Sequence, residues 1–77
     1  MHTVIKGTKT ITEYKMLKAY MEQKAKEYYE NHKNAVEHWQ EGNISKVWIN
    51  SGNFFIEYES GKCWQYNEAG DPSQMQE

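Results

Sequence analysis

The longest regular pattern in the chain is helical and runs from Thr12 to Glu41. Apolar side chains recur there at intervals of three and four, the spacing that gathers residues on one face of an α-helix. The stripe consists of Tyr14, Leu17, Met21, Ala25, Tyr28, His32, Ala35 and Trp39. Thr10 and Glu13 fit a capping box at the start, Thr12 is an alternative cap, and Gly42 marks the end. We therefore expect one helix, either straight or bent at Asn31–Asn34, where helix propensity drops.

After the helix the pattern changes to alternation of apolar and polar residues, which is typical of strands with one buried face. Three short segments show it: Ile44–Asn50, Asn53–Glu59 and Lys62–Asn67. Ser51-Gly52 and Ser60-Gly61 separate them, and dipeptides of this kind close tight hairpins. These segments predict a three-stranded antiparallel meander.

Together these elements predict one α+β domain over residues 1–67, in which a single long or bent helix packs on the meander. Thr3–Lys6 is a candidate for a short fourth strand at the edge of the sheet. Residues 68–77 carry no pattern, and we expect them to form a disordered tail.

Two-residue loops at both turns would set the register of the strands. Lys46 would then face Glu57, and Glu59 would face Lys62, so that each hairpin gains a pair of opposite charges across the ladder. A three-residue loop with a bulge at either turn would break this register.

The two faces of the sheet differ in character in this register. The face toward the helix carries Val47, Ile49, Phe54, Ile56, Tyr58 and Cys63. The second face carries Lys46, Trp48, Phe55, Glu57, Glu59, Lys62, Trp64 and Tyr66. Four aromatic side chains form a patch that monomers rarely leave bare. We expect the second face either to bind a partner or to be covered by the N-terminal segment or the tail.

Composition narrows the class of protein. The 77 residues are 14% aromatic, include no Arg, and carry a formal net charge of −2, which disfavours binding to phosphate-rich partners. The single cysteine, Cys63, excludes an internal disulfide, and no stretch is apolar enough for a signal peptide or a membrane span. These features predict a cytoplasmic protein without membrane contact.

No motif in the chain indicates catalysis. Alternation places Cys63 among the buried hydrophobic residues, and His32 on the apolar stripe is expected to be a core or edge histidine. Glu57 and Glu59 lie two residues apart on one strand, but their lysine partners favour a charge-paired surface over acid–base chemistry. The His and Cys residues lack metal-ligand spacing, and the glycines are isolated. The sequence therefore predicts no enzyme activity, no metal and no cofactor.

Protein binding is the function that the second face favours, because aromatic residues concentrate at the centres of interfaces. The alternative is a single-stranded nucleic-acid-binding domain that stacks bases on the same aromatic residues, although Glu57 and Glu59 oppose it. A 30-residue helix of about 45 Å would overhang strands of about 23 Å. A homodimer through the helix or the aromatic face would cover this excess.

Residues 47–68, VWINSGNFFIEYESGKCWQYNE, resemble the terminal hairpins of some small phage-encoded anti-CRISPR proteins. The matching elements are Gly52, Phe54-Phe55, Tyr58, Gly61-Lys62 and Trp64. Some of those proteins likewise place a helix before an antiparallel sheet. The resemblance implies a stoichiometric inhibitor that binds a bacterial immune effector in the host cell and has no enzyme activity of its own.

Overall fold

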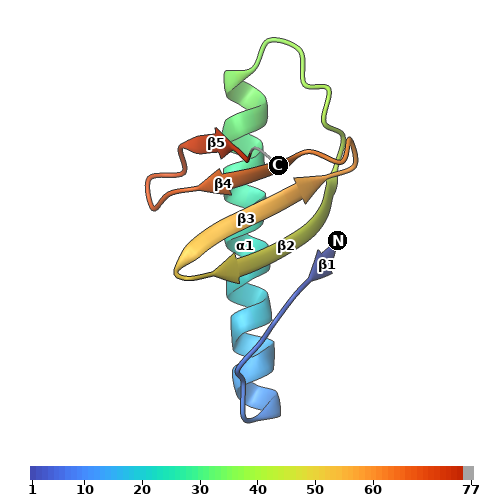
Figure 1. The fold of residues 1–77 in the computed structure, drawn as a ribbon. Coiled ribbons are helices and arrows are strands. Elements are labelled where there is room, and N and C mark those ends of the chain that lie inside the picture. The colour runs from blue at the N-terminus through green and yellow to red at the C-terminus, as the bar shows by residue number, and fades with distance from the viewer. Residues whose placement is uncertain (76–77) are drawn as a thin grey trace.

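The computed structural model describes residues 1–75 as one helix packed on one face of a five-stranded sheet (Figure 1). The elements are β1 (His2–Thr3), α1 (Ile11–Ala35), β2 (Ile44–Asn50), β3 (Asn53–Tyr58), β4 (Cys63–Tyr66) and β5 (Pro72–Gln74). The strands follow one another across the sheet in chain order. β1 is parallel to β2, and all other neighbours are antiparallel. The α+β class is confirmed, whereas a three-stranded meander understates the mixed sheet.

Thr10 caps the helix as predicted, whereas the return bond of Glu13 goes to the residue before the cap. The Thr10 side chain accepts a hydrogen bond from the Glu13 N–H at 3.0 Å, and the Glu13 carboxylate accepts one from the Lys9 N–H at 2.9 Å. The predicted end at Glu41 is wrong, because α1 stops at Ala35. The last turns contain the Asn31–Asn34 segment, whose low helix propensity leaves little to hold the helix beyond it.

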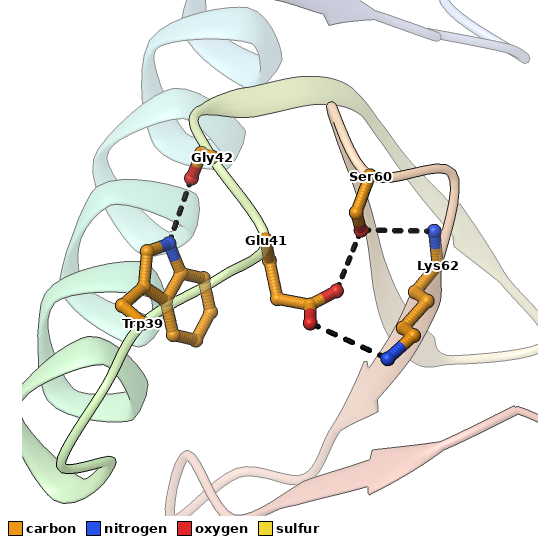
Figure 2. A network of polar contacts seen from close by, with 5 residues as sticks. All are labelled: Trp39, Glu41, Gly42, Ser60 and Lys62. Carbon is orange, nitrogen blue, oxygen red and sulfur yellow. Dashed lines mark hydrogen bonds and ion pairs between the residues drawn. The ribbon is translucent and has the colours of Figure 1, made fainter.

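Trp39 nevertheless packs where the apolar stripe predicts, because the loop of residues 36–43 returns it to the helix. Its ring meets His32 edge-on at a centroid distance of 4.9 Å and Tyr58 at 5.1 Å. The indole N–H donates to the Gly42 carbonyl at 2.8 Å (Figure 2). A helical spacing of apolar residues therefore continued past the point where the helix ended.

The first hairpin has the predicted register. Lys46 lies opposite Glu57, and Trp48 lies opposite Phe55. Ser51 and Gly52 both have positive φ, at 52° and 79°, as a two-residue turn that matches the strand twist requires. Before Lys46 the ladder shifts at a bulge between β2 and β3.

The predicted register of the second hairpin is wrong by one residue. The Tyr58 N–H donates to the Lys62 carbonyl at 3.0 Å, which closes a three-residue loop, and Gly61 adopts a φ of 91° within it. Cys63 therefore pairs with Glu57. Since side chains alternate along a strand, a slip of one residue moves every β4 side chain to the opposite face. Trp64 turns toward α1, and Cys63 turns away from it.

The core lies between α1 and the sheet. Its buried members are Met21, Ala25, Tyr28, Val47, Phe54, Ile56, Tyr58 and Tyr66. Trp39 and Trp64 pack against this cluster while partly exposed. Three of the four aromatic rings in the buried cluster, those of Tyr28, Tyr58 and Tyr66, therefore also carry a hydroxyl group.

Both edges of the sheet differ from expectation. β1 is shorter than the predicted Thr3–Lys6 strand, and the Thr3 hydroxyl donates to the Glu22 carboxylate of α1 at 2.9 Å. β5 forms where the sequence predicts a disordered tail, and its Pro72 pairs with Tyr66. Residues 76–77 of that predicted tail lie outside the described residues.

Candidate binding groove

Four of the predicted partner-binding residues share the outer face of the sheet, the face away from α1. Trp48 stacks on Phe55 with centroids 5.4 Å apart, and the Lys46 ammonium lies 5.1 Å from the Trp48 ring centroid. Phe55 is only 7% exposed. Glu57 accepts a hydrogen bond from the Cys63 thiol at 3.6 Å, so Cys63 belongs to this outer face and not to the helix-facing core. Trp48 is the aromatic ring that this face chiefly offers to a partner.

Trp64 and Tyr66 lie on the opposite face, which corrects their predicted placement. The Tyr66 hydroxyl is 2.8 Å from His32 Nδ1 and 2.5 Å from the Tyr58 hydroxyl, so three polar groups are satisfied inside the core. His32 is thus the core histidine that the sequence predicts.

Burial shifts the pKa values of His32, Tyr58 and Tyr66. It lowers the pKa of His32, and Glu41 partly opposes the effect. Burial raises the pKa of Tyr58 to about 12. Burial also raises the pKa of Tyr66, and its hydrogen bond with the Tyr58 hydroxyl raises this pKa further. All three side chains are therefore neutral at neutral pH, and the arrangement stabilises the fold.

Glu59 and Lys62 do not form the predicted cross-strand pair. Glu59 accepts a hydrogen bond from the Asn43 N–H at 2.7 Å. Lys62 lies 3.6 Å from Glu41, whose carboxylate also accepts a hydrogen bond from Ser60 at 2.6 Å (Figure 2). These contacts hold the loop of residues 36–43 against the β3–β4 turn.

A groove with a volume of about 540 Å³ lies at the other end of the molecule, between the N-terminal segment, α1 and β2. We call it the N-terminal groove. Its lining consists of Val4, Ile5, Lys6, Leu17, Met21, Lys46, Trp48, Ile49 and Asn50. Sequence reasoning missed this groove, although the overhang of the helix beyond the strands was a signal for it.

α1 extends past the sheet at this end, and the N-terminal segment runs beside it (Figure 1). Its first turns expose large apolar side chains, with Ile11 at 75% and Tyr14 at 44%. Tyr14 and the groove residues Leu17 and Met21 follow one another at helical spacing. The apolar stripe that packs on the sheet therefore continues through the partly buried Leu17 in the groove to the exposed Tyr14 beyond it.

Charge is distributed unevenly between the two ends of the chain. Residues 1–20 contain four lysines and one glutamate, whereas the remaining residues contain five lysines and ten acidic side chains. Lys6 and Lys46 line the groove itself. An acidic protein thus has a positively charged region around its exposed apolar surface.

A second recess of about 270 Å³ lies between the loop of residues 36–43 and the β4 side of the sheet. His32, Glu41 and Trp64 are among its lining residues. The Trp64 indole N–H is buried and has no hydrogen-bond acceptor among the described residues. Within residues 1–75 no cluster of three His, Cys, Asp or Glu side chains is placed to hold a metal ion, and α1 is too polar to cross a bilayer.

Comparison of the chain with protein-family models, with curated proteins and with solved structures finds no match. Its function is therefore inferred from its own residues.

Proposed function

We propose that the protein is a non-enzymatic protein-binding module that docks a partner protein in the N-terminal groove. The observation that carries this proposal is the apolar stripe of α1, which passes through Leu17 in the groove to the exposed Tyr14. Contiguous apolar surface rimmed by charged residues is typical of protein interaction sites. Trp48 at the margin supplies the kind of aromatic side chain that dominates binding energy in interfaces.

A bound partner would cover the first turns of α1, which the sheet leaves exposed. The stripe is buried at Met21, Ala25 and Tyr28. The sheet stops short of the first turns of α1 (Figure 1). A docked partner surface would bury Tyr14 and Leu17 as the sheet buries Met21 and Ala25. This burial is favourable because it removes apolar area from water.

Capture from a lysate of the native host tests the groove with two matched variants. Leu17→Asp places a charge in the groove, and Met16→Ser changes a neighbouring residue that is 69% exposed and does not line it. We expect the wild type and Met16→Ser to retain the same protein at one-to-one stoichiometry, and Leu17→Asp to lose it. Retention of that protein by a folded Leu17→Asp variant would contradict docking in the groove.

The hairpin resemblance implies a class of partner, namely a bacterial immune effector of the CRISPR type, with the protein acting as a phage-encoded inhibitor in the bacterial cytoplasm. A purified effector nuclease tests this class directly. Target cleavage should fall in proportion to added protein and stop near equimolar amounts. Undiminished cleavage at about tenfold excess would exclude the effector tested and leave docking in the groove in place.

Single-stranded nucleic acid is the second candidate ligand. One observation favours it: Trp48 lies beside Lys46, and both line the groove together with Lys6. Against it, Trp64 and Tyr66 face the core, and Lys46 already lies over the Trp48 ring. Quenching of Trp fluorescence by a deca-thymidylate at low salt, abolished in Trp48→Phe, would support this candidate, and no quenching would exclude it.

A further inference from the structure

The edge of β2 beside the groove is only partly covered by β1. β1 pairs with Lys46 and Val47 alone, and the last hydrogen bond of this ladder runs from the Val4 N–H to the Val47 carbonyl at 2.8 Å. After Val4 the chain leaves the sheet and runs along α1 toward its first turn (Figure 1). The remainder of β2 has no strand beside it on this side among the described residues.

Ile49 is the residue whose backbone N–H and C=O point to this open edge. Alternate residues of a strand direct their backbone groups to the same side, and the Val47 carbonyl faces β1, so those of Ile49 face the same way. The first hairpin agrees, because Asn50 and Asn53 close its two-residue turn and bond to each other, which leaves Ile49 on the outer side. This donor and acceptor thus border the groove, and no strand within residues 1–75 pairs with them.

We infer that the groove takes an extended segment of a partner protein, which adds a strand to β2 at Ile49. This inference rests on the proposed function and specifies how the partner binds. Strand addition uses main-chain hydrogen bonds for affinity and pockets for alternate side chains for specificity. The segment carries apolar residues on one face and acidic residues on the other.

The two sides of the added strand meet different chemistry. Toward α1 it meets Ile5, Leu17 and Met21, which accept apolar side chains. Toward the outer face it meets Lys46, and Lys6 lines the same groove. Because side chains of a strand alternate, a sequence with apolar and acidic residues at every second position matches both sides.

The same charges disfavour other occupants. A second copy that added its own N-terminal segment would bring its lysine-rich residues 1–20 against those of the first copy. A nucleic-acid strand satisfies lysines but has no amide ladder to pair with Ile49. An acidic polypeptide segment uses both the charge and the open edge.

A capped hexapeptide of alternating valine and glutamate is the probe. We expect NMR titration to shift the amides of Ile49 and Leu17, and saturation to slow hydrogen exchange of the Ile49 amide by at least about tenfold. The same peptide N-methylated at every residue keeps its side chains but has no N–H to donate to a backbone ladder in either strand direction, and it should bind at least about tenfold more weakly. A valine–lysine peptide should not bind.

Two substitutions test the protein side. Ile49→Pro removes the outward-facing N–H and leaves the β2–β3 ladder intact, so it should weaken valine–glutamate peptide binding about tenfold, whereas Ile49→Val should not. Lys46→Glu should reverse the preference toward the valine–lysine peptide. Strand addition is overturned by equal binding of the N-methylated peptide, by unchanged binding to Ile49→Pro, by no binding of the valine–glutamate peptide, or by Ile49 shifts produced only by deca-thymidylate.

These outcomes are separable from the proposed function. If strand addition fails while Leu17→Asp still abolishes partner capture, the partner binds through side-chain contacts and the module proposal stands. If Leu17→Asp retains the partner as well, both proposals fall.

Discussion

Tyr66 connects three polar groups inside an aromatic core. Its hydroxyl lies within hydrogen-bond distance of His32 Nδ1 and of the Tyr58 hydroxyl, and its ring stacks on Tyr28 with centroids 5.3 Å apart. The ring supplies apolar contact, and the hydroxyl satisfies two neighbours that would otherwise be buried without a partner. Such satisfaction matters because an unpaired buried polar group carries its full desolvation cost.

Tyr66→Phe separates these two roles. The substitution keeps the ring and leaves His32 and Tyr58 without their shared partner, so we expect the free energy of unfolding in urea to fall by about 1–3 kcal/mol. Tyr20→Phe, at a residue 54% exposed, is the matched control and should change little. Equal stabilities of the two variants would show that the hydroxyl network contributes nothing.

His32 makes stability depend on pH near neutrality. Burial lowers its pKa in the folded state below the ordinary value of 6.5, with Glu41 in partial opposition, so the unfolded chain binds the proton more readily. Stability is then complete above about pH 6.5 and decreases as pH falls toward the folded-state pKa. His32→Gln cannot titrate, while His2 and His38 remain in both chains.

We therefore expect the wild type to lose more unfolding free energy than His32→Gln between about pH 7.5 and 5.5. Urea titrations of both proteins at the two pH values measure the difference. A parallel loss in the two chains would assign the pH dependence to other groups.

At the scale of the elements, the features that depend on neighbouring residues were predicted correctly. The features that depend on contacts between distant parts of the chain were not. The Thr10 cap and the Ser51-Gly52 turn are set within a few residues, and both are present as predicted. Ser60-Gly61 fits a two-residue or a three-residue turn equally well. The charges of Glu59 and Lys62 then favoured the wrong register, because each has its partner in the loop of residues 36–43.

The C-terminal end of α1 could not be predicted from the sequence pattern for a related reason. Trp39 keeps the helical spacing of the stripe and does pack on His32, but it reaches that position from a loop. Periodicity reports which side chains meet the core and not the backbone path that brings them there.

The corrected register predicts different roles for two tryptophans that the sequence placed on one face. Trp64 packs against the core and meets His32 edge-on at 4.5 Å, so Trp64→Ala should lower the free energy of unfolding by about 3 kcal/mol. Trp48→Ala removes a ring on the outer face and should cost about 1 kcal/mol or less. Urea unfolding of the two single variants measures both, and equal losses would restore the register predicted from sequence.

At the scale of the whole molecule, the candidate groove depends on three stretches that are distant in the chain, around residues 5, 19 and 48. No local pattern joins them, so the predicted binding face was placed on the sheet alone. One global signal was sound: α1 has 25 residues and a length of about 37 Å, and it overhangs strands of at most 7 residues. The overhang is smaller than predicted, and it is the part of the helix that carries the exposed apolar residues.

The overhang also raises the question of self-association, which charge decides. Two copies that covered each other's exposed helix turns would set their lysine-rich residues 1–20 side by side, and this repulsion is strongest at low salt. We expect sedimentation at about 50 μM protein and about 20 mM salt to give the monomer mass of 9.2 kDa.

The variant Lys15→Glu/Lys18→Glu tests the cause of that result. It reverses two charges beside the exposed stripe without changing any apolar residue, and we expect it to associate at concentrations where the wild type does not, because the apolar contact is no longer opposed. A wild-type dimer at low salt would show instead that a second copy covers the helix. It would also mean that the surface assigned here to an acidic partner is already occupied.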